Sequence, residues 1–122
     1  MNNGVVNDAL ARSQIEMLLS LDDGEGAVLQ EIVGEYLAMS EEGRADLLRA
    51  LRAGDATAVG RAAHSLKGAS ANVGALALAD VCGDIERHAR HEDVQDAAGL
   101  QAQFESEFSR ARVALLSVAS RP

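Results

Sequence analysis

A single histidine stands among residues that suit the handling of phosphate. His64 lies in the segment GRAAHSLKGA, residues 60–69. If this segment is helical, its neighbours at three and four residues in either direction share one face with it. They are two glycines and two cations, namely Gly60, Gly68, Arg61 and Lys67. A neutral imidazole is a competent nucleophile near neutral pH, and a lysine can neutralise phosphoryl oxygens as a point charge. The pattern therefore indicates an imidazole that carries phosphate.

The glycines and the helix phase both predict that His64 is accessible. A glycine inside a helix costs about 1 kcal/mol relative to alanine, so a pair of them around an exposed ring indicates cleared space. The apolar stripe of this helix passes through Ala62, Leu66 and Ala69. His64 lies about 200° from the first two, which points it away from the core. Two alternatives stay open from the residues alone: a satisfied core histidine, and an exposed face whose glycines have no function.

The elements that must position this histidine are predicted to be helices throughout. Helix-forming residues dominate, the one proline is the final residue, and runs of β-branched residues are absent, all of which favour an all-α chain. We expect helical segments over residues 8–20, 27–53, 55–72, 75–90 and 94–118. The second segment is interrupted by polar residues at 40–43 and is either one bent helix or two short ones; the spacing favours one.

The connections between these segments are short. Gly54 suits a left-handed helix end and Asp55 suits the N-cap of the next helix, while Gly74 suits the end of that helix. Apolar residues in the last segment recur near period 3.5, which is typical of near-antiparallel helix packing. The predicted architecture is an up-down four-helix bundle with a short additional N-terminal helix, in a single domain over residues 1–122 with its core at about 27–118.

Charge and cysteine content exclude several classes of function. Nineteen acidic against eleven basic side chains give a net charge of −8, which argues against nucleic acid and anionic membrane as partners. One cysteine excludes an internal disulfide. No apolar run is long enough for a membrane span, and the N-terminus lacks the pattern of a signal peptide. We expect a cytoplasmic protein, and a monomer.

The residues around His64 resemble the signature of histidine-containing phosphotransfer (HPt) domains. The segment AHSLKGAS at 63–70, followed by Asn72-Val73-Gly74, is similar to the family pattern His-x-x-Lys-Gly with a small-residue stretch that ends in an apolar residue and glycine. The segment LRAGD at 51–55 is also typical, and downstream residues continue the similarity weakly: Leu78, Cys82 and Glu86. The resemblance covers about residues 27–118 and implies a four-helix bundle.

The resemblance also implies roles for matching residues. His64 would be the phosphoacceptor and phosphodonor, Lys67 would lie beside the phosphoryl group, and Gly68 would leave room for a partner's active site. Many members have serine where this chain has Ala69, which removes one hydroxyl contact and leaves Ser70 as a nearby candidate donor.

The implied partners are response-regulator receiver domains and a sensor or hybrid histidine kinase. The chain would be a carrier rather than an enzyme, since it has no nucleotide-binding motif, and it would need no cofactor of its own. Mg²⁺ would belong to the receiver. We expect the receiver to dock on the histidine helix and the helix before it, with contacts at Gly60, Arg61, Ser65 and Ala71.

Other functions remain possible for these residues. The chain could be a non-catalytic four-helix interaction module, or the phosphoacceptor domain of a larger chemotaxis-type or hybrid histidine kinase. His88 and His91, with Asp84 and Glu92, could form a surface metal site, although a solvated helix end is the simpler interpretation. Cys82 lies on an apolar stripe and is expected to be buried and inert. The acidic turn at 22–25 lacks the spacing of a calcium loop.

Overall fold

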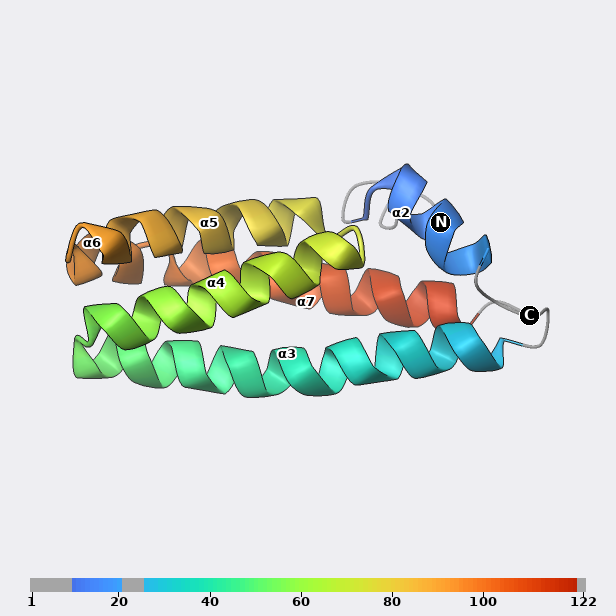
Figure 1. The fold of residues 1–122 in the computed structure, drawn as a ribbon, viewed down its shortest axis with the longest axis horizontal. Coiled ribbons are helices and arrows are strands. Elements are labelled where there is room, and N and C mark those ends of the chain that lie inside the picture. The colour runs from blue at the N-terminus through green and yellow to red at the C-terminus, as the bar shows by residue number, and fades with distance from the viewer. Residues whose placement is uncertain (1–9, 21–25, 121–122) are drawn as a thin grey trace.

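A computed structural model describes residues 10–20 and 26–120, and within these ranges every regular element is an α-helix. In chain order the helices are α2 (Arg12–Ser20), α3 (Ala27–Ala53), α4 (Ala56–Asn72), α5 (Leu76–Arg90), α6 (Val94–Ala98) and α7 (Gln101–Ala119). The four long helices α3, α4, α5 and α7 run up and down beside one another (Figure 1). The all-α class and the four-helix bundle with a short first helix are therefore confirmed.

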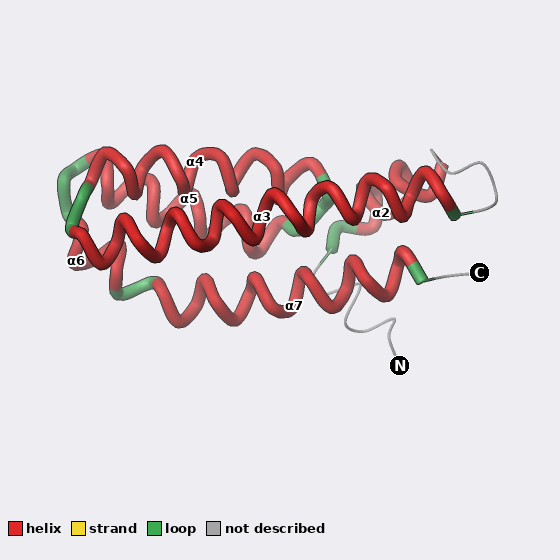
Figure 2. The backbone as a smooth tube through the Cα atoms, turned by 90° about the horizontal axis from the view of Figure 1, so that it is seen from below, coloured by secondary structure: helices red, strands yellow, loops and turns green. Residues whose placement is uncertain are grey.

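The neighbours in the bundle follow the order of the chain. Helix α4 packs between α3 and α5, and α7 packs against both α3 and α5. Figure 2, seen from below, shows α7 running alongside α3. A bidentate ion pair joins these two helices, since Arg44 on α3 lies 2.6 and 2.8 Å from the carboxylate oxygens of Glu105 on α7. Helix α4, which carries His64, therefore has a neighbouring helix on each side, α3 and α5.

Residues 27–53 form one helix, as the spacing favoured. The helix ends at Gly54, whose φ of 67° is left-handed and therefore suits glycine. Asp55 then caps α4, because its side chain accepts a hydrogen bond of 3.1 Å from the backbone N–H of Ala58. Gly74, with a φ of 81°, closes the other end of α4. Both ends of the His64 helix are therefore where the sequence predicted them.

The prediction of one helix over 94–118 was wrong. The chain forms α6, turns at Gly99 and Leu100, and starts again as α7. Asp93 caps α6 by accepting a hydrogen bond of 3.1 Å from Asp96 N, and Ala97 is fully buried. Glycine disfavours helix continuation, and the break lets α6 fold against the end of α5. Because the apolar seam runs on across the turn, periodicity could not reveal the break.

The first helix also differs from its prediction. It starts at Arg12 rather than at residue 8, and residues 8–9 lie outside the described residues. The backbone N–H of Ala11 donates to Gly74 O at 2.7 Å, so the chain before α2 is tied to the α4–α5 turn. Ile15 and Leu18 of this helix are buried, whereas Met17 is exposed.

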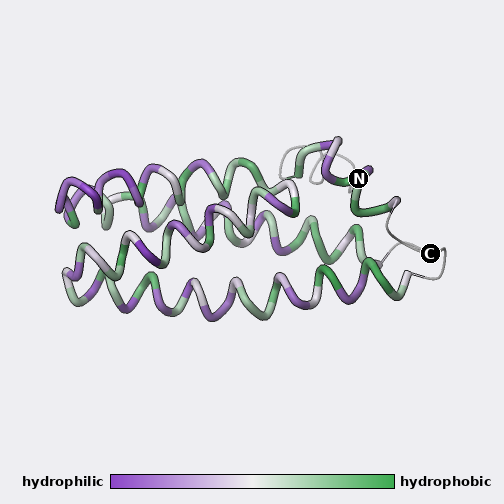
Figure 3. The backbone as a smooth tube through the Cα atoms, in the orientation of Figure 1, coloured by the Kyte–Doolittle hydropathy of each residue, from purple (hydrophilic) through white to green (hydrophobic). Residues whose placement is uncertain are grey.

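The buried face of α4 is displaced by less than one residue from the predicted stripe, and Leu66 belongs to both. Its core residues are Val59, Ala63, Leu66 and Ser70, while Ala62 and Ala69 are only half-buried. The displacement arises because α4 has neighbours on two sides, so its buried face is centred between α3 and α5. Figure 3 shows hydrophilic and hydrophobic segments alternating along the long helices, as amphipathic packing requires. Among the described helices, none combines the length and apolar character that crossing a membrane requires.

Candidate phosphoacceptor site

His64 is exposed on α4 and is hydrogen-bonded to the neighbouring helix. Its side chain is 67% exposed, and Nδ1 lies 2.9 Å from Oε2 of Glu86 on α5. The Glu86 side chain, by contrast, is only 6% exposed. The predicted accessibility of His64 is confirmed, although the ring does not stand apart from the bundle. It lies at the α4–α5 boundary, where a buried carboxylate holds one ring nitrogen.

Two cations hold the other positions on this carboxylate. Lys67 Nζ lies 2.7 Å from Glu86 Oε1, and Arg90 Nη2 lies 2.6 Å from Oε2. A buried carboxylate is costly unless it is paired and hydrogen-bonded, and Glu86 meets both conditions. Lys67 is therefore engaged with Glu86 in this structure rather than pointing freely at solvent.

The surroundings of Glu86 favour its ionised form. Burial raises the pKa of Glu86, but the hydrogen bonds from Lys67 and His64 lower it. The charges of Lys67 and Arg90 lower it further, and together they outweigh burial, so the pKa lies below its ordinary value of 4.5. Glu86 is therefore a carboxylate at neutral pH.

An ionised carboxylate fixes which nitrogen of His64 carries the proton. A carboxylate only accepts hydrogen bonds, so Nδ1 is the donor to Glu86 in the 2.9 Å contact. In a neutral ring the lone pair is then on Nε2. The arrangement can present a nucleophilic nitrogen while the other nitrogen is held in a fixed orientation.

The local charge suits an anion. The Lys67 and Arg90 side chains outnumber the single carboxylate of Glu86 that they share. Arg61 lines the same open depression as His64, which has a volume of about 870 Å³. Among the described residues Arg61 has no hydrogen-bond or ion-pair partner. The lining of this depression holds two cations, Arg61 and Arg90, and two carboxylates, Glu86 and Glu92. Lys67, which is bound to Glu86, adds the one further cation beside the imidazole, although the chain as a whole has a net charge of −8.

The two glycines near His64 have different surroundings. A β-carbon added at Gly68 would meet nothing within 4 Å, so packing does not require a glycine there. A β-carbon at Gly60 would lie 3.7 Å from Ala89 Cβ, an ordinary contact with α5. The open space that the sequence predicted on both sides of His64 is therefore present at Gly68 and partly filled at Gly60.

The remaining predicted contact residues are divided between two depressions. Ser65 is exposed and lines the His64 depression with Gly60 and Arg61. Ala71 lies in another depression of about 550 Å³ between α4 and α5, which Lys67 also lines. The structure thus brings Gly60, Arg61 and Ser65 together and places Ala71 apart from them.

Ser70 was wrongly considered as a donor near the phosphate. It is fully buried on the core side of α4. Its hydroxyl lies 2.8 Å from the hydroxyl of Tyr36 on α3, which satisfies both groups in the bundle interior. Six residues after His64, a helical side chain points to another face of the helix.

Sequence reasoning gave little weight to Glu86 and none to Arg90. Glu86 appeared only as a weak part of the family spacing, although it lies on the stripe that Cys82, Ile85 and Ala89 bury. A lone carboxylate on an apolar stripe, followed by an arginine four residues later, was the available signal. Such a carboxylate requires a partner, and the nearest candidates were the cations of α4.

The other titratable candidates lie away from this cluster. His88, Asp93 and Asp96 offer donor atoms within 4.8 Å of one another, and of these only His88 belongs to the set that the sequence suggested. Cys82 is fully buried, and burial raises the pKa of its thiol to about 12, so its burial was predicted correctly. The acidic turn at 22–25 lies outside the described residues.

Comparison with known proteins supports the resemblance seen in the sequence. A family model, the Hpt domain, matches residues 31–114. A similar solved structure is that of histidine-containing phosphotransfer protein B (HptB) from Pseudomonas aeruginosa PAO1. It is 33% identical in sequence, with a TM-score of 0.84, and the match covers 93% of this chain and 96% of that one. A comparison with curated protein sequences found no significant match. The chain therefore belongs to the Hpt domain family, the histidine-containing phosphotransfer proteins of phosphorelays.

Proposed function

We propose that His64 is the residue that receives and donates the phosphoryl group. The observation that carries this proposal is the hydrogen bond of 2.9 Å between His64 Nδ1 and the buried carboxylate of Glu86. It orients an exposed ring and leaves the lone pair on Nε2. Neither of these features follows from the sequence motif alone.

The transfer is a displacement at phosphorus. The Nε2 lone pair of His64 attacks the phosphorus of an acyl phosphate on a receiver's aspartate. The N–P bond forms, the P–O bond to the aspartate breaks, and the carboxylate leaves with the electron pair. The reverse sequence passes the group to a second receiver. Most of the catalysis is positioning and charge stabilisation, to which the receiver contributes its Mg²⁺.

Three residues of this chain assist that transfer in our proposal. Glu86 orients the ring. Lys67, now 2.7 Å from Glu86 Oε1, supplies positive charge when the phosphoryl group arrives. Gly68 leaves the approach to the ring open, because it has no side chain and a β-carbon added there would meet nothing within 4 Å. The chain needs no cofactor and acts as a carrier whose chemistry the partner completes.

The partners we propose are receiver domains and a sensor or hybrid histidine kinase, in the cytoplasm. Gly60, Arg61 and Ser65, which line the His64 depression, are the first contacts with a receiver. Ala71, in the neighbouring depression, contributes at its edge.

The proposal is tested by transfer from a phosphorylated receiver. His64→Gln should abolish labelling and leave the helix content unchanged, while His88→Gln and His91→Gln should be labelled like the wild type. The label should be lost in acid and retained in base, as expected of a phosphoramidate rather than an acyl phosphate. Labelling that persists in His64→Gln, or that moves to His88, would overturn the assignment.

A further inference from the structure

Lys67 is the only lysine in the chain. Ten of the eleven basic side chains are arginines, and the single lysine lies three residues after His64. A guanidinium keeps its proton at any pH that a protein meets, whereas an amine that has lost its proton is a nucleophile. Apart from its α-amine, the chain therefore has its whole amine reactivity beside the phosphoacceptor.

Contacts with α5 hold the Lys67 side chain in place. A β-carbon added at Gly83 would lie 3.4 Å from Lys67 Cδ, so the aliphatic part of the side chain lies across this glycine. Nζ lies 2.7 Å from Oε1 of Glu86, and the side chain is 39% exposed. The amine is therefore ordered, accessible to a small molecule and next to a carboxylate that can accept a proton.

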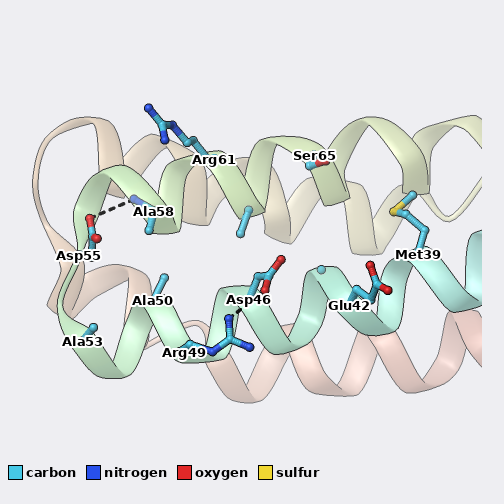
Figure 4. Close-up of a pocket in the computed structure, with 12 residues that line it drawn as sticks. Met39, Glu42, Asp46, Arg49, Ala50, Ala53, Asp55, Ala58, Arg61 and Ser65 are labelled. Carbon is cyan, nitrogen blue, oxygen red and sulfur yellow. Dashed lines mark hydrogen bonds and ion pairs between the residues drawn. The ribbon is translucent and has the colours of Figure 1, made fainter.

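Two arginines near this amine can bind a phosphate group. Arg61 lines the His64 depression and extends away from α3 (Figure 4), with no partner among the described residues. Arg90 lines the same depression and bonds Glu86 through Nη2. No other acceptor in the described part of the chain bonds this guanidinium, which leaves further N–H groups for an anion. These arginines offset the two carboxylates in the lining, Glu86 and Glu92.

An acyl phosphate, the group that this site is proposed to handle, has two electrophilic atoms. His64 attacks the phosphorus in the proposed transfer. The carbonyl carbon is one bridging oxygen away, and an amine that attacks it forms an amide and releases phosphate. His64 and Lys67 are bonded to the two oxygens of one carboxylate. A molecule as small as acetyl phosphate, held by the neighbouring arginines, can therefore reach both nitrogens.

We propose that Lys67 is a site of N-acylation by small acyl phosphates such as acetyl phosphate, and that acylation slows the relay. The inference rests on the proposed function, in which the charge of Lys67 assists transfer. After the ammonium has lost a proton to water, Nζ attacks the carbonyl carbon. The N–C bond forms, the C–O bond breaks and phosphate leaves with the electron pair. The excess proton on the nitrogen passes to Glu86 Oε1 and then to the departing phosphate. The amide that results is uncharged and cannot neutralise a phosphoryl group.

The experiment compares two acetyl donors on the full chain. Acetyl phosphate carries the anion that the arginines would bind. N-Acetoxysuccinimide is neutral, so its reaction reports only the exposure and reactivity of each amine. Arg49→Lys supplies a reference amine, since Arg49 is exposed on α3 and lies 2.9 Å from a carboxylate, that of Asp46 (Figure 4). Site-resolved mass spectrometry measures the acetylation of residues 49 and 67 in the same molecule.

We expect acetyl phosphate to favour Lys67 over the reference amine about tenfold more than the neutral donor does, which corresponds to one charge-assisted hydrogen bond. Arg61→Gln should reduce this preference. Arg52→Gln, at an exposed position of α3 that lines neither depression, should leave it unchanged. The inference fails if the two donors show the same preference, or if Arg61→Gln and Arg52→Gln have equal effects.

The consequence for the relay is measured after the donor has been removed. Transfer from a phosphorylated receiver to the wild type should slow in proportion to the acetylated fraction. Lys67→Arg has no amine at this position and should transfer at the same rate before and after treatment. Slowing in both proteins, or in neither, would overturn the effect on the relay. Failure of the untreated wild type to be labelled at His64 would instead overturn the proposed function, whereas acetylation is measured independently by mass.

Discussion

His64 and Glu86 lie on adjacent helices, and a hydrogen bond of 2.9 Å joins Nδ1 of one to Oε2 of the other. The same oxygen also accepts a bond of 2.6 Å from Arg90. One buried carboxylate therefore orients the imidazole and holds a cation next to it. The properties of the site depend on this carboxylate, and the first two predictions concern it.

Removing the Glu86 carboxylate should slow transfer without removing the acceptor. In Glu86→Ala the ring loses its orienting partner, and misplacement of a reacting group can cost about a hundredfold in rate. Glu86→Gln retains a carbonyl oxygen that can accept from Nδ1, so its loss should be smaller. Single-turnover transfer from a phosphorylated receiver measures both, with circular dichroism as the control for folding. Equal, wild-type rates in both variants would remove Glu86 from the mechanism.

Glu86 should also make stability depend on pH. Its pKa in the folded protein lies below 4.5, so the ionised form contributes stability that is fully present above pH 4.5. That contribution is lost as the pH falls through the lower, folded-state value. Between pH 7 and pH 3 the free energy of unfolding of the wild type should therefore fall more than that of Glu86→Gln. Urea denaturation at several pH values tests this, with Glu16→Gln, at an exposed position, as the matched control. Parallel curves for wild type and Glu86→Gln would contradict it.

Substitutions at two glycines with open surroundings distinguish an effect on access to His64 from an effect on stability. Gly68 and Gly34 are both helical, and a β-carbon added at either would meet nothing within 4 Å. Alanine at either position should therefore raise the free energy of unfolding by about 0.5–1 kcal/mol, which urea denaturation measures. Gly68→Gln should weaken receiver binding and slow transfer together, because the side chain obstructs the ring. Gly34→Gln should do neither.

Lys67→Ala should differ from Gly68→Gln in its kinetics. It removes a cation rather than adding bulk, so transfer should slow, or the phosphohistidine lifetime should change, with a smaller loss of receiver affinity. Affinity and single-turnover rates, measured on both variants, decide the point. Wild-type transfer by a folded Gly68→Gln protein would show that this glycine does not serve access.

Gly43→Ala should lower the free energy of unfolding, in contrast to Gly34→Ala and Gly68→Ala. The new β-carbon would lie 2.8 Å from Leu66 Cδ2, and Leu66 is fully buried. Overpacking of this kind costs about 1–3 kcal/mol, which exceeds the gain of up to about 1 kcal/mol from helix propensity. Thermal or urea unfolding should therefore show a less stable protein. A stabilised Gly43→Ala would mean that α3 and α4 can separate at this point without cost.

The sequence was informative where local chemistry determines the structure. Gly54 and Asp55 ended one helix and began the next as predicted, because a left-handed cap and a side-chain cap are local interactions. The break at Gly99 was missed, because it depends on how α6 packs against α5. His64 was identified from its neighbours within one helix. Glu86 was given little weight, because two of its partners, His64 and Lys67, lie on another helix and only packing brings them together.

The division of the site between α4 and α5 determines what can be transplanted. A segment that contains His64, Lys67 and Gly68 carries the whole sequence motif, yet the carboxylate that positions the ring is on the following helix. Grafted onto an unrelated helix, the segment would bring a nucleophile with no preferred tautomer and a lysine without its counterion. The smallest portable unit is a helical hairpin with its packing intact. A designer who wishes to place a phosphohistidine in a new scaffold must therefore copy an interface between helices rather than a run of residues.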